Sequence, residues 1–243
     1  MLNRPVIVPN GLQNTLKSIL VGNDTFRTRY AKRDEILVHE SDAADYSILL
    51  LDGWIALSKT FQSGDVQIID MMLPGDFALV GTQMVAVAAT TMEALSDVEY
   101  IRIGPNDANG PCAASARLRQ VLAASILTTQ SRTSELLLRL GRGSAASRIA
   151  YALLEIYTRL QAVGRTEGAA FEFPISQQKF GEFTGMTNVH VCRTMRRFEV
   201  GGLIRHFDRH SIELIDLPAL CALADIDLDR FKEEILIRWP LPA

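Results

Sequence analysis

Residues 188–200 combine an apolar face with a basic one, a pattern suited to binding DNA. Val191, Met195 and Phe198 follow one another at spacings of four and three, which predicts a helix with these three side chains facing a core. The opposite face carries Asn188, His190, Arg193, Arg196 and Arg197. Arginine matches the O6 and N7 acceptors of guanine, and polar and basic groups also contact phosphates. These side chains predict contact with double-stranded DNA in the major groove.

The residues before this helix predict its partner in a helix-turn-helix unit. Ser176 is a predicted N-cap for a helix over 177–183. Residues 184–186 form a tight turn, in which Gly185 tolerates a positive φ. Thr187 is a good N-cap for the second helix. The candidate DNA-binding residues are Ser176, Gln177, Thr187, Asn188, Val189, His190, Arg193 and Arg197.

A hairpin is predicted directly after the second helix. Gly201 and Gly202 end that helix, and residues 203–207 and 211–215 then read as two strands. A hairpin at this place is the wing of a winged helix-turn-helix. The alternative is an ordinary solvated helix with a basic face, which would not explain the turn, the caps and the hairpin in this order.

The N-terminal half is predicted to be β-structure, from residue 36 to residue 103. Asp52-Gly53 lies between two apolar runs and predicts a hairpin. Residues 62–65 and 74–76 are two further turns. Turns at this spacing predict an antiparallel β-roll or jelly roll.

A long helix is predicted over residues 113–140, because neither Gly nor Pro interrupts it. Its heptad-like seam consists of Leu122, Ile126, Thr129, Thr133, Leu136 and Leu140. The seam could dock on its own β-roll or pair with a second copy of the chain. Pairing is favoured, because so long a helix overhangs a small barrel. Residues 141–144 then break the helix and mark a hinge.

The fold class is therefore α+β, and the chain divides into four segments. The predicted boundaries are a β-roll sensor domain over 1–110, a dimerisation helix over 111–141, a winged helix-turn-helix over 142–220 and a tail over 221–243. The tail alternates aspartates with apolar residues, and one interpretation is a helix that packs on a neighbouring domain.

Net charge and cysteine usage limit the function classes. The chain of 243 residues has a net charge of −3, but residues 142–205 carry +4 and the rest −7, as expected for a basic module joined to an acidic one. Three widely spaced cysteines without a CxxC pair argue against a zinc or iron–sulfur site. No signal peptide or membrane-spanning stretch is evident, so a cytoplasmic protein is expected. Catalytic motifs are also missing, so we expect no enzyme, no metal and no cofactor.

The order of β-roll, long helix and winged helix resembles the Crp/Fnr superfamily of transcription regulators. The resemblance spans roughly residues 30–220 and rests on residues 52–54, 73–77 and 186–194, the last string being similar to an alphaproteobacterial branch. It implies a homodimer that binds a two-fold operator and contacts RNA polymerase. It also implies that Asn188, Val189 and Arg193 read bases.

The sensor half departs from the cyclic-nucleotide binders of that superfamily. Their Gly-Glu pair corresponds to Leu79 and Val80 here, and their Arg-Ser or Arg-Thr pair to Ala88 and Ala89. Residues 78–92 contain no charged side chain that could neutralise a phosphate. Cyclic AMP is therefore not the expected effector. The four residues either pack in a core or line a pocket for an apolar effector.

Three further interpretations concern His39, Cys192 and the class of function. His39 could ligate haem, but a lone histidine is more often a surface or structural residue. Cys192 could be oxidised, but a packing role is favoured. The main alternative function is an effector-binding or protein-interaction module with degenerate DNA readout, and salt-dependent binding to duplex DNA separates the two.

Overall fold

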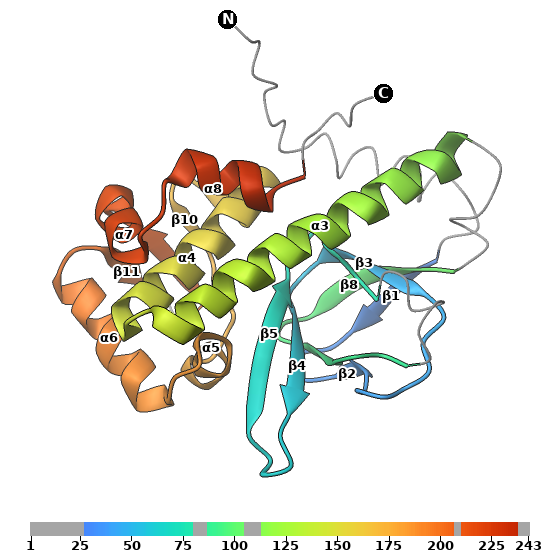
Figure 1. The fold of residues 1–243 in the computed structure, drawn as a ribbon, viewed down its shortest axis with the longest axis horizontal. Coiled ribbons are helices and arrows are strands. Elements are labelled where there is room, and N and C mark those ends of the chain that lie inside the picture. Colours follow the sequence, from blue (N-terminus) through green and yellow to red (C-terminus); the bar gives the residue numbers. More distant parts are fainter. Residues whose placement is uncertain (1–26, 80–86, 105–112, 207–209, 238–243) are drawn as a thin grey trace, which may run out of the picture. The chain divides into compact units, whose positions relative to one another are not determined.

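The computed structural model describes residues 27–79, 87–104, 113–206 and 210–237 (Figure 1). Within them the chain forms two compact units. The N-terminal unit holds the described parts of residues 27–59 and 71–129. The C-terminal unit holds residues 60–70 and the described parts of 130–236. Among the described residues, no helix combines the length and apolar character needed to cross a membrane.

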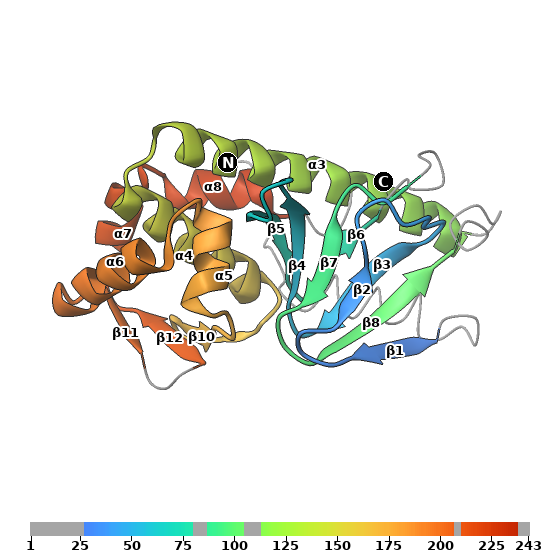
Figure 2. The same cartoon turned by 90° about the horizontal axis from the view of Figure 1, so that it is seen from below.

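Two antiparallel sheets make up the β-structure of the first half of the chain. One has the strand order β1-β8-β3-β6 and the other β2-β7-β4-β5 (Figure 2). The strands are β1 (Thr28–Ala31), β2 (Ile36–Val38), β3 (Ser47–Asp52), β4 (Ile55–Thr60), β5 (Val66–Met72), β6 (Phe77–Ala78), β7 (Thr91–Ala94) and β8 (Val98–Ile103). This arrangement confirms the predicted antiparallel β-roll. The first strand, β1, begins eight residues before the predicted β-region.

The hairpin predicted at Asp52-Gly53 is wrong. Strand β3 pairs with β8 and β6, whereas β4 pairs with β7, so the turn joins two different sheets. Gly53 is needed there, because its φ is 83° and a Cβ atom would lie 2.2 Å from the carbonyl oxygen of Asp97. The Asp-Gly signal reports a local turn and says nothing about which strands then pair. The turn over residues 62–65, in contrast, joins β4 and β5, which are neighbours in one sheet.

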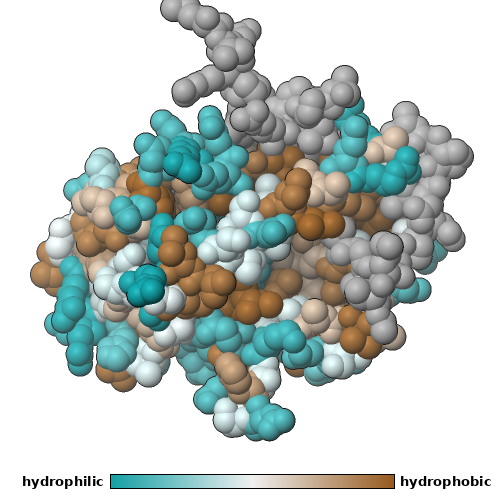
Figure 3. All heavy atoms as spheres, viewed as in Figure 1, coloured by the Kyte–Doolittle hydropathy of each residue, from teal (hydrophilic) through white to brown (hydrophobic). Residues whose placement is uncertain are grey.

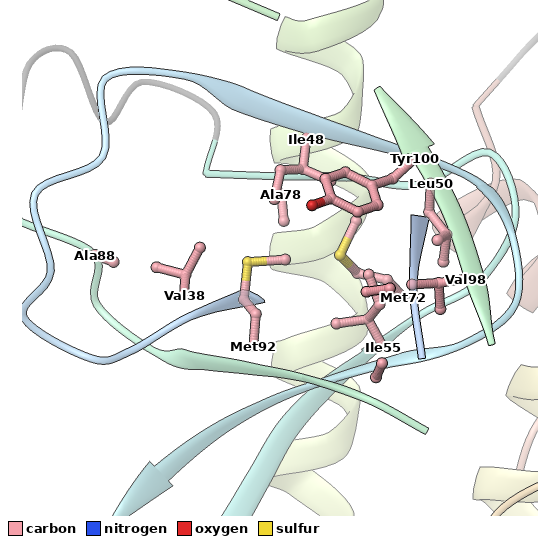
Figure 4. Packing of buried hydrophobic residues seen from close by; sticks show 12 residues of the cluster. Val38, Ile48, Leu50, Ile55, Met72, Ala78, Ala88, Met92, Val98 and Tyr100 are labelled. Carbon is pink, nitrogen blue, oxygen red and sulfur yellow. The ribbon is translucent and has the colours of Figure 1, made fainter. Parts of the chain in front are cut away.

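Apolar side chains fill the space between the two sheets. Figure 4 shows Met72, Met92 and Tyr100 converging with aliphatic residues from several strands. All twelve members of this cluster are buried, and none carries a charge. Three residues of the uncharged stretch over 78–92, Ala78, Ala88 and Met92, belong to this closely packed cluster.

The long predicted helix is α3 (Ala113–Arg142). The six residues of its predicted seam follow one stripe of the helix but differ in burial. Leu122 and Leu136 are buried within their own chain, whereas Ile126 is 49% exposed and Thr133 is also exposed. Thr129 and Leu140 are half-buried. The inward face includes Ser125, Arg132 and Arg139, polar residues that a search for apolar spacing passes over.

Helix α4 (Ala145–Ala162) lies at the centre of the C-terminal unit, and its residues 149–160 are all buried. The predicted wing and both helices of the helix-turn-helix are present. The elements are β9 (Thr166–Glu167), β10 (Ala170–Glu172), α5 (Gln177–Thr184), α6 (Asn188–Val200), β11 (Ile204–His206), β12 (Ser211–Leu214), α7 (Leu217–Ala224) and α8 (Leu228–Ile235). Their strands form one antiparallel sheet in the order β11-β12-β10-β9. Strand β9 is two residues long and pairs with β10.

The tail adds α8 to this unit. Asp227 caps α8 by accepting a hydrogen bond from the backbone N–H of Arg230 at 2.9 Å. Phe231 then packs edge-on against Tyr151 of α4, with 5.6 Å between the ring centroids. The tail thus contains a helix, as interpreted from the sequence, and this helix packs on α4 of the segment predicted as the winged helix-turn-helix domain, in the same compact unit. The predicted domain boundaries differ from the two compact units, since residues 60–70 group with the C-terminal one.

Candidate nucleic-acid interface

A short, well-capped helix begins the candidate interface. The side chain of Ser176 accepts a hydrogen bond from the backbone N–H of Lys179 at 3.2 Å, as predicted. The helix α5 ends at Gly185, which adopts a φ of 64°. A Cβ atom on Gly181 would lie 2.5 Å from the carbonyl oxygen of Met186. Glycine at position 181 therefore lets the turn approach α5 closely enough to form the helix-turn-helix.

The second helix is fixed at its start and along one face. Thr187 accepts a hydrogen bond from the backbone N–H of His190 at 3.4 Å, which confirms the predicted cap. Val191, Met195 and Phe198 are buried, as their spacing predicts. Core packing on one face holds the helix, so its other face is free to present side chains to a ligand.

All eight candidate DNA-binding residues are exposed. Val189 is 65% exposed, which is unusual for an apolar residue on a helix that also contributes to a core. Arg193 and Arg197 lie one turn apart on the exposed side of α6, and Arg196 is exposed between them. Ser176 and Gln177 are exposed at the start of α5. The two helix N-termini thus present backbone N–H groups and short polar side chains, which suit phosphate oxygens.

The wing is joined to α6 by a side-chain hydrogen bond that the sequence pattern did not indicate. His206 of β11 lies 2.9 Å from Glu199 of α6, measured between Nδ1 and Oε1. Arg205 pairs with Glu213 across the β11–β12 ladder. The tip of the wing, residues 207–209, lies outside the described residues. The hydrogen-bonding side chains of Glu199 and His206 could have suggested the contact, but only once the fold had brought these elements together.

A pocket of about 440 Å³ lies between α5, α6 and the wing. Its polar lining includes Gln177, Cys192, Arg196, Glu199 and His206. Cys192 is exposed, so the packing role predicted for it is wrong. Residue 192 lies on the side of α6 that faces this pocket rather than on the side that faces the core.

The described candidate effector residues, Leu79, Ala88 and Ala89, differ in burial. Ala88 is buried in the core cluster, and its backbone N–H donates to the carbonyl oxygen of Asp42 at 2.8 Å. Leu79 is half-buried against the same cluster, and Ala89 is exposed. Val80 lies outside the described residues. Ala88 thus supports the core reading of this stretch.

The described residues offer no metal site and no buried histidine for haem. They contain no group of three or more His, Cys, Asp or Glu side chains placed to hold a metal ion. His39 is exposed, in keeping with the surface role favoured for it.

Two protein families match the two halves of this architecture. The cyclic nucleotide-binding domain family matches residues 28–113, and the Crp-like helix-turn-helix domain family matches residues 147–223. Among solved structures, FixK2 from Bradyrhizobium japonicum has the same fold, with a TM-score of 0.73, 22% identity, and coverage of 82% of this chain and 97% of that one.

Relatives in sequence carry regulatory names. A probable transcriptional activator of Rhizobium leguminosarum bv. viciae is 29% identical over 186 residues, which is 76% of each chain. The transcriptional activator protein FnrA of Stutzerimonas stutzeri is 26% identical over 210 residues, covering 84% of this chain and 82% of FnrA. With the β-roll, the long helix and the exposed basic face of α6, these matches place the chain in the Crp/Fnr family of DNA-binding transcription regulators, whose members are not enzymes.

Proposed function

We propose that the chain binds a two-fold DNA operator as a homodimer, with α6 of each copy in the major groove. One observation carries this proposal: Asn188, Val189 and Arg193 are exposed together on the first two turns of a helix whose other face is locked in a core. A helix fits the major groove, and its N-terminal residues are the ones that reach base edges. A DNA regulator works where the chromosome is, so the proposed location is the cytoplasm.

Each exposed side chain has a chemical role in this proposal. Arg193 donates two hydrogen bonds to guanine, and Val189 contacts the methyl group of a thymine. Asn188 contacts an adenine or a phosphate. Ser176, Gln177, Thr187 and His190 lie at or near the two helix N-termini, and we assign them to phosphates. Arg197 lies further from the N-terminus of α6, and its partner is also a phosphate.

Dimerisation is assigned to the outward face of α3. Ile126 and Leu137 are eleven residues apart, close to three helical turns, so both point the same way. Leu127 and Leu138 repeat this relation on a neighbouring line. These four leucine and isoleucine side chains are 49–69% exposed. Apolar surface lies along the course of α3 in Figure 3. A partner copy would bury this surface and place two recognition helices about one DNA turn apart.

The proposal also includes an effector and a contact with RNA polymerase. Residues 78–92 contain no charged side chain that could bind the phosphate of cyclic AMP. We therefore propose an effector other than cyclic AMP, and a contact with RNA polymerase like that implied by the family. A degenerate interaction module is the weaker candidate, because the whole reading face of α6 is intact.

A binding selection tests the proposal. Purified protein would be mixed with duplexes that carry a randomised segment of about 25 base pairs, and the retained DNA would be sequenced. We expect an enriched motif with two inverted half-sites centred about 10 base pairs apart, and affinity that falls steeply as salt rises. Enrichment of a single half-site would contradict the homodimer. Absence of any enriched motif would contradict sequence-specific binding.

A further inference from the structure

Four charged side chains meet in the interior of the C-terminal unit. Arg132 of α3 bonds Asp70 of β5, with 2.8 Å between Nη2 and Oδ2. Arg159 of α4 bonds Glu155 of the same helix, with 2.6 Å between Nη1 and Oε1. The two pairs are cross-linked, since Arg159 also lies 3.7 Å from Asp70 and Arg132 lies 3.9 Å from Glu155. The four side chains are only 2–10% exposed.

Such a network adds little to stability but constrains geometry. The desolvation of four charges roughly cancels their mutual attraction, whereas removal of a single partner leaves a buried charge uncompensated. Two carboxylates and two guanidinium groups balance one another here. Each hydrogen-bonded contact fixes a direction as well as a distance. The network therefore holds β5, α3 and α4 in one mutual arrangement.

A second contact extends this arrangement to the helix-turn-helix. The amide of Gln67, also on β5, donates to the carbonyl oxygen of Glu182 at 2.6 Å and of Phe183 at 3.3 Å. These carbonyls lie in the last turn of α5, where backbone acceptors lack partners within the helix. On strand β5, Gln67 thus binds α5, whereas Asp70 binds α3 and α4.

The network lies on the opposite side of α3 from the proposed partner surface. Arg132, Leu136 and Arg139 face inward and are buried, whereas Leu137 and Leu138 face outward. The same helical segment would therefore contact the second copy on one side and orient α4 on the other. Any change in the angle between α3 and α4 would displace α6 relative to the two-fold axis.

We propose that Asp70, Arg132, Glu155 and Arg159, together with Gln67, are positioning residues that set which half-site spacing the dimer accepts. This inference rests on the proposed homodimer on a two-fold operator. Because none of the five side chains is assigned a DNA contact, they act through the placement of α6. Loss of the network should relax the spacing requirement and leave the base preference within each half-site unchanged.

The test measures affinity for operators that share both half-sites and differ by one or two base pairs in the spacer. The wild-type protein should prefer one spacing. For Asp70→Asn, we expect the ratio between the preferred and the altered spacers to fall by about tenfold, in the range of couplings between residues of one network. Asp65→Asn is the matched control, because Asp65 lies in the exposed turn of the same hairpin. Its spacing ratio should equal that of the wild type.

Two further variants separate positioning from folding. Gln67→Met removes the amide but no charge, so it should fold and should lower the spacing ratio in the same direction. Asp70→Asn combined with Arg132→Gln restores charge balance, and it should recover unfolding free energy without recovering the ratio.

The outcomes are distinct. An equal loss of affinity on every spacer, or an unchanged ratio in folded, dimeric Asp70→Asn and Gln67→Met, would overturn the positioning role. If the wild type binds its half-sites without preferring any spacing, the two-fold operator of the proposed function fails, and the positioning role fails with it.

Discussion

Arg193 and Arg197 have the same side chain and are both exposed, but their positions on α6 give them different expected roles in DNA binding. Arg193 lies in the second turn, where a recognition helix reaches base edges. We expect Arg193→Ala to cost about 1–3 kcal/mol of binding free energy and to relax the preference at one base pair per half-site. Binding selection on randomised duplexes measures both. An unchanged motif for this variant would place the helix differently in the groove.

Arg197→Ala serves as the comparison. A phosphate contact carries no sequence information, so its loss should weaken all sequences similarly. It should also reduce the slope of log affinity against log salt by about 1 per half-site, because one counterion fewer is released. Loss of base preference in Arg197→Ala would contradict this division of roles.

Gly181 offers a test of the helix-turn-helix geometry itself. An added Cβ atom would meet the carbonyl oxygen of Met186 at 2.5 Å, a backbone atom that cannot move without opening the turn. We expect Gly181→Ala to lower the free energy of unfolding by about 1–3 kcal/mol. Gly141→Ala is the control, since nothing lies within 4 Å of its added Cβ atom in α3. The control should be neutral or stabilising by up to about 1 kcal/mol. Urea unfolding of both variants and the wild type measures these differences in the free energy of unfolding.

Local hydrogen bonds were predictable from the sequence, whereas long-range ones were not. Ser176 and Thr187 bond to backbone groups three residues away, so their residue type and position suffice. Asp70 and Arg132 are 62 residues apart. No spacing rule joins them, because their contact exists only after β5, α3 and α4 have packed.

Helix α3 shows the same limit at the scale of an element. The stretch over 113–140 without Gly or Pro predicts most of its length, although α3 continues through Gly141 to Arg142. Its inward face does not follow from apolar spacing. Arg132 and Arg139 are buried because carboxylates and a carbonyl oxygen meet them there. With Arg132 and Arg139 on the inward face, Leu137 lies on the outward face, and the predicted seam contains its neighbour Leu136 instead. An apolar pattern identifies the core only where the core is apolar.

The outward face of α3 gives a test of the homodimer. Ile126→Asp combined with Leu137→Asp places two charges on the proposed interface without disturbing the buried Leu122 or Leu136. We expect monomers in sedimentation experiments, because an interface desolvates these charges without a partner. Leu223→Asp, at an exposed leucine of α7, is the control and should remain dimeric. A double variant that stays dimeric would place the interface elsewhere.

The stability of the whole molecule should depend on the protonation of Glu155. Burial raises the pKa of this carboxyl above its ordinary value of 4.5, with Arg159 opposing and Asp70 reinforcing the shift. An acid with a raised folded-state pKa stabilises the fold below the unfolded pKa and loses that contribution as pH rises through the folded pKa. The difference in unfolding free energy between Glu155→Gln and wild type should therefore shift toward the variant as pH rises from 4.5. Urea unfolding at several pH values measures it, and a flat difference would contradict the shift.

Ligand binding tests the sensor half as a whole. Titration calorimetry at low salt should show no binding of cyclic AMP at physiological concentrations, because residues 78–92 supply no cation for its phosphate. Micromolar affinity would contradict this expectation and would point to backbone N–H groups as the phosphate ligands.

Helix α6 also bears on how regulators of this kind diverge. Val191, Thr194, Met195 and Phe198 are buried and hold the fold, whereas Asn188, Val189 and Arg193 are exposed and contribute nothing to the core. Substitutions of these three exposed residues should therefore change the stability of the fold very little. After gene duplication, one copy can acquire a new set of target promoters through a few changes at these positions, while the fold stays under unchanged selection.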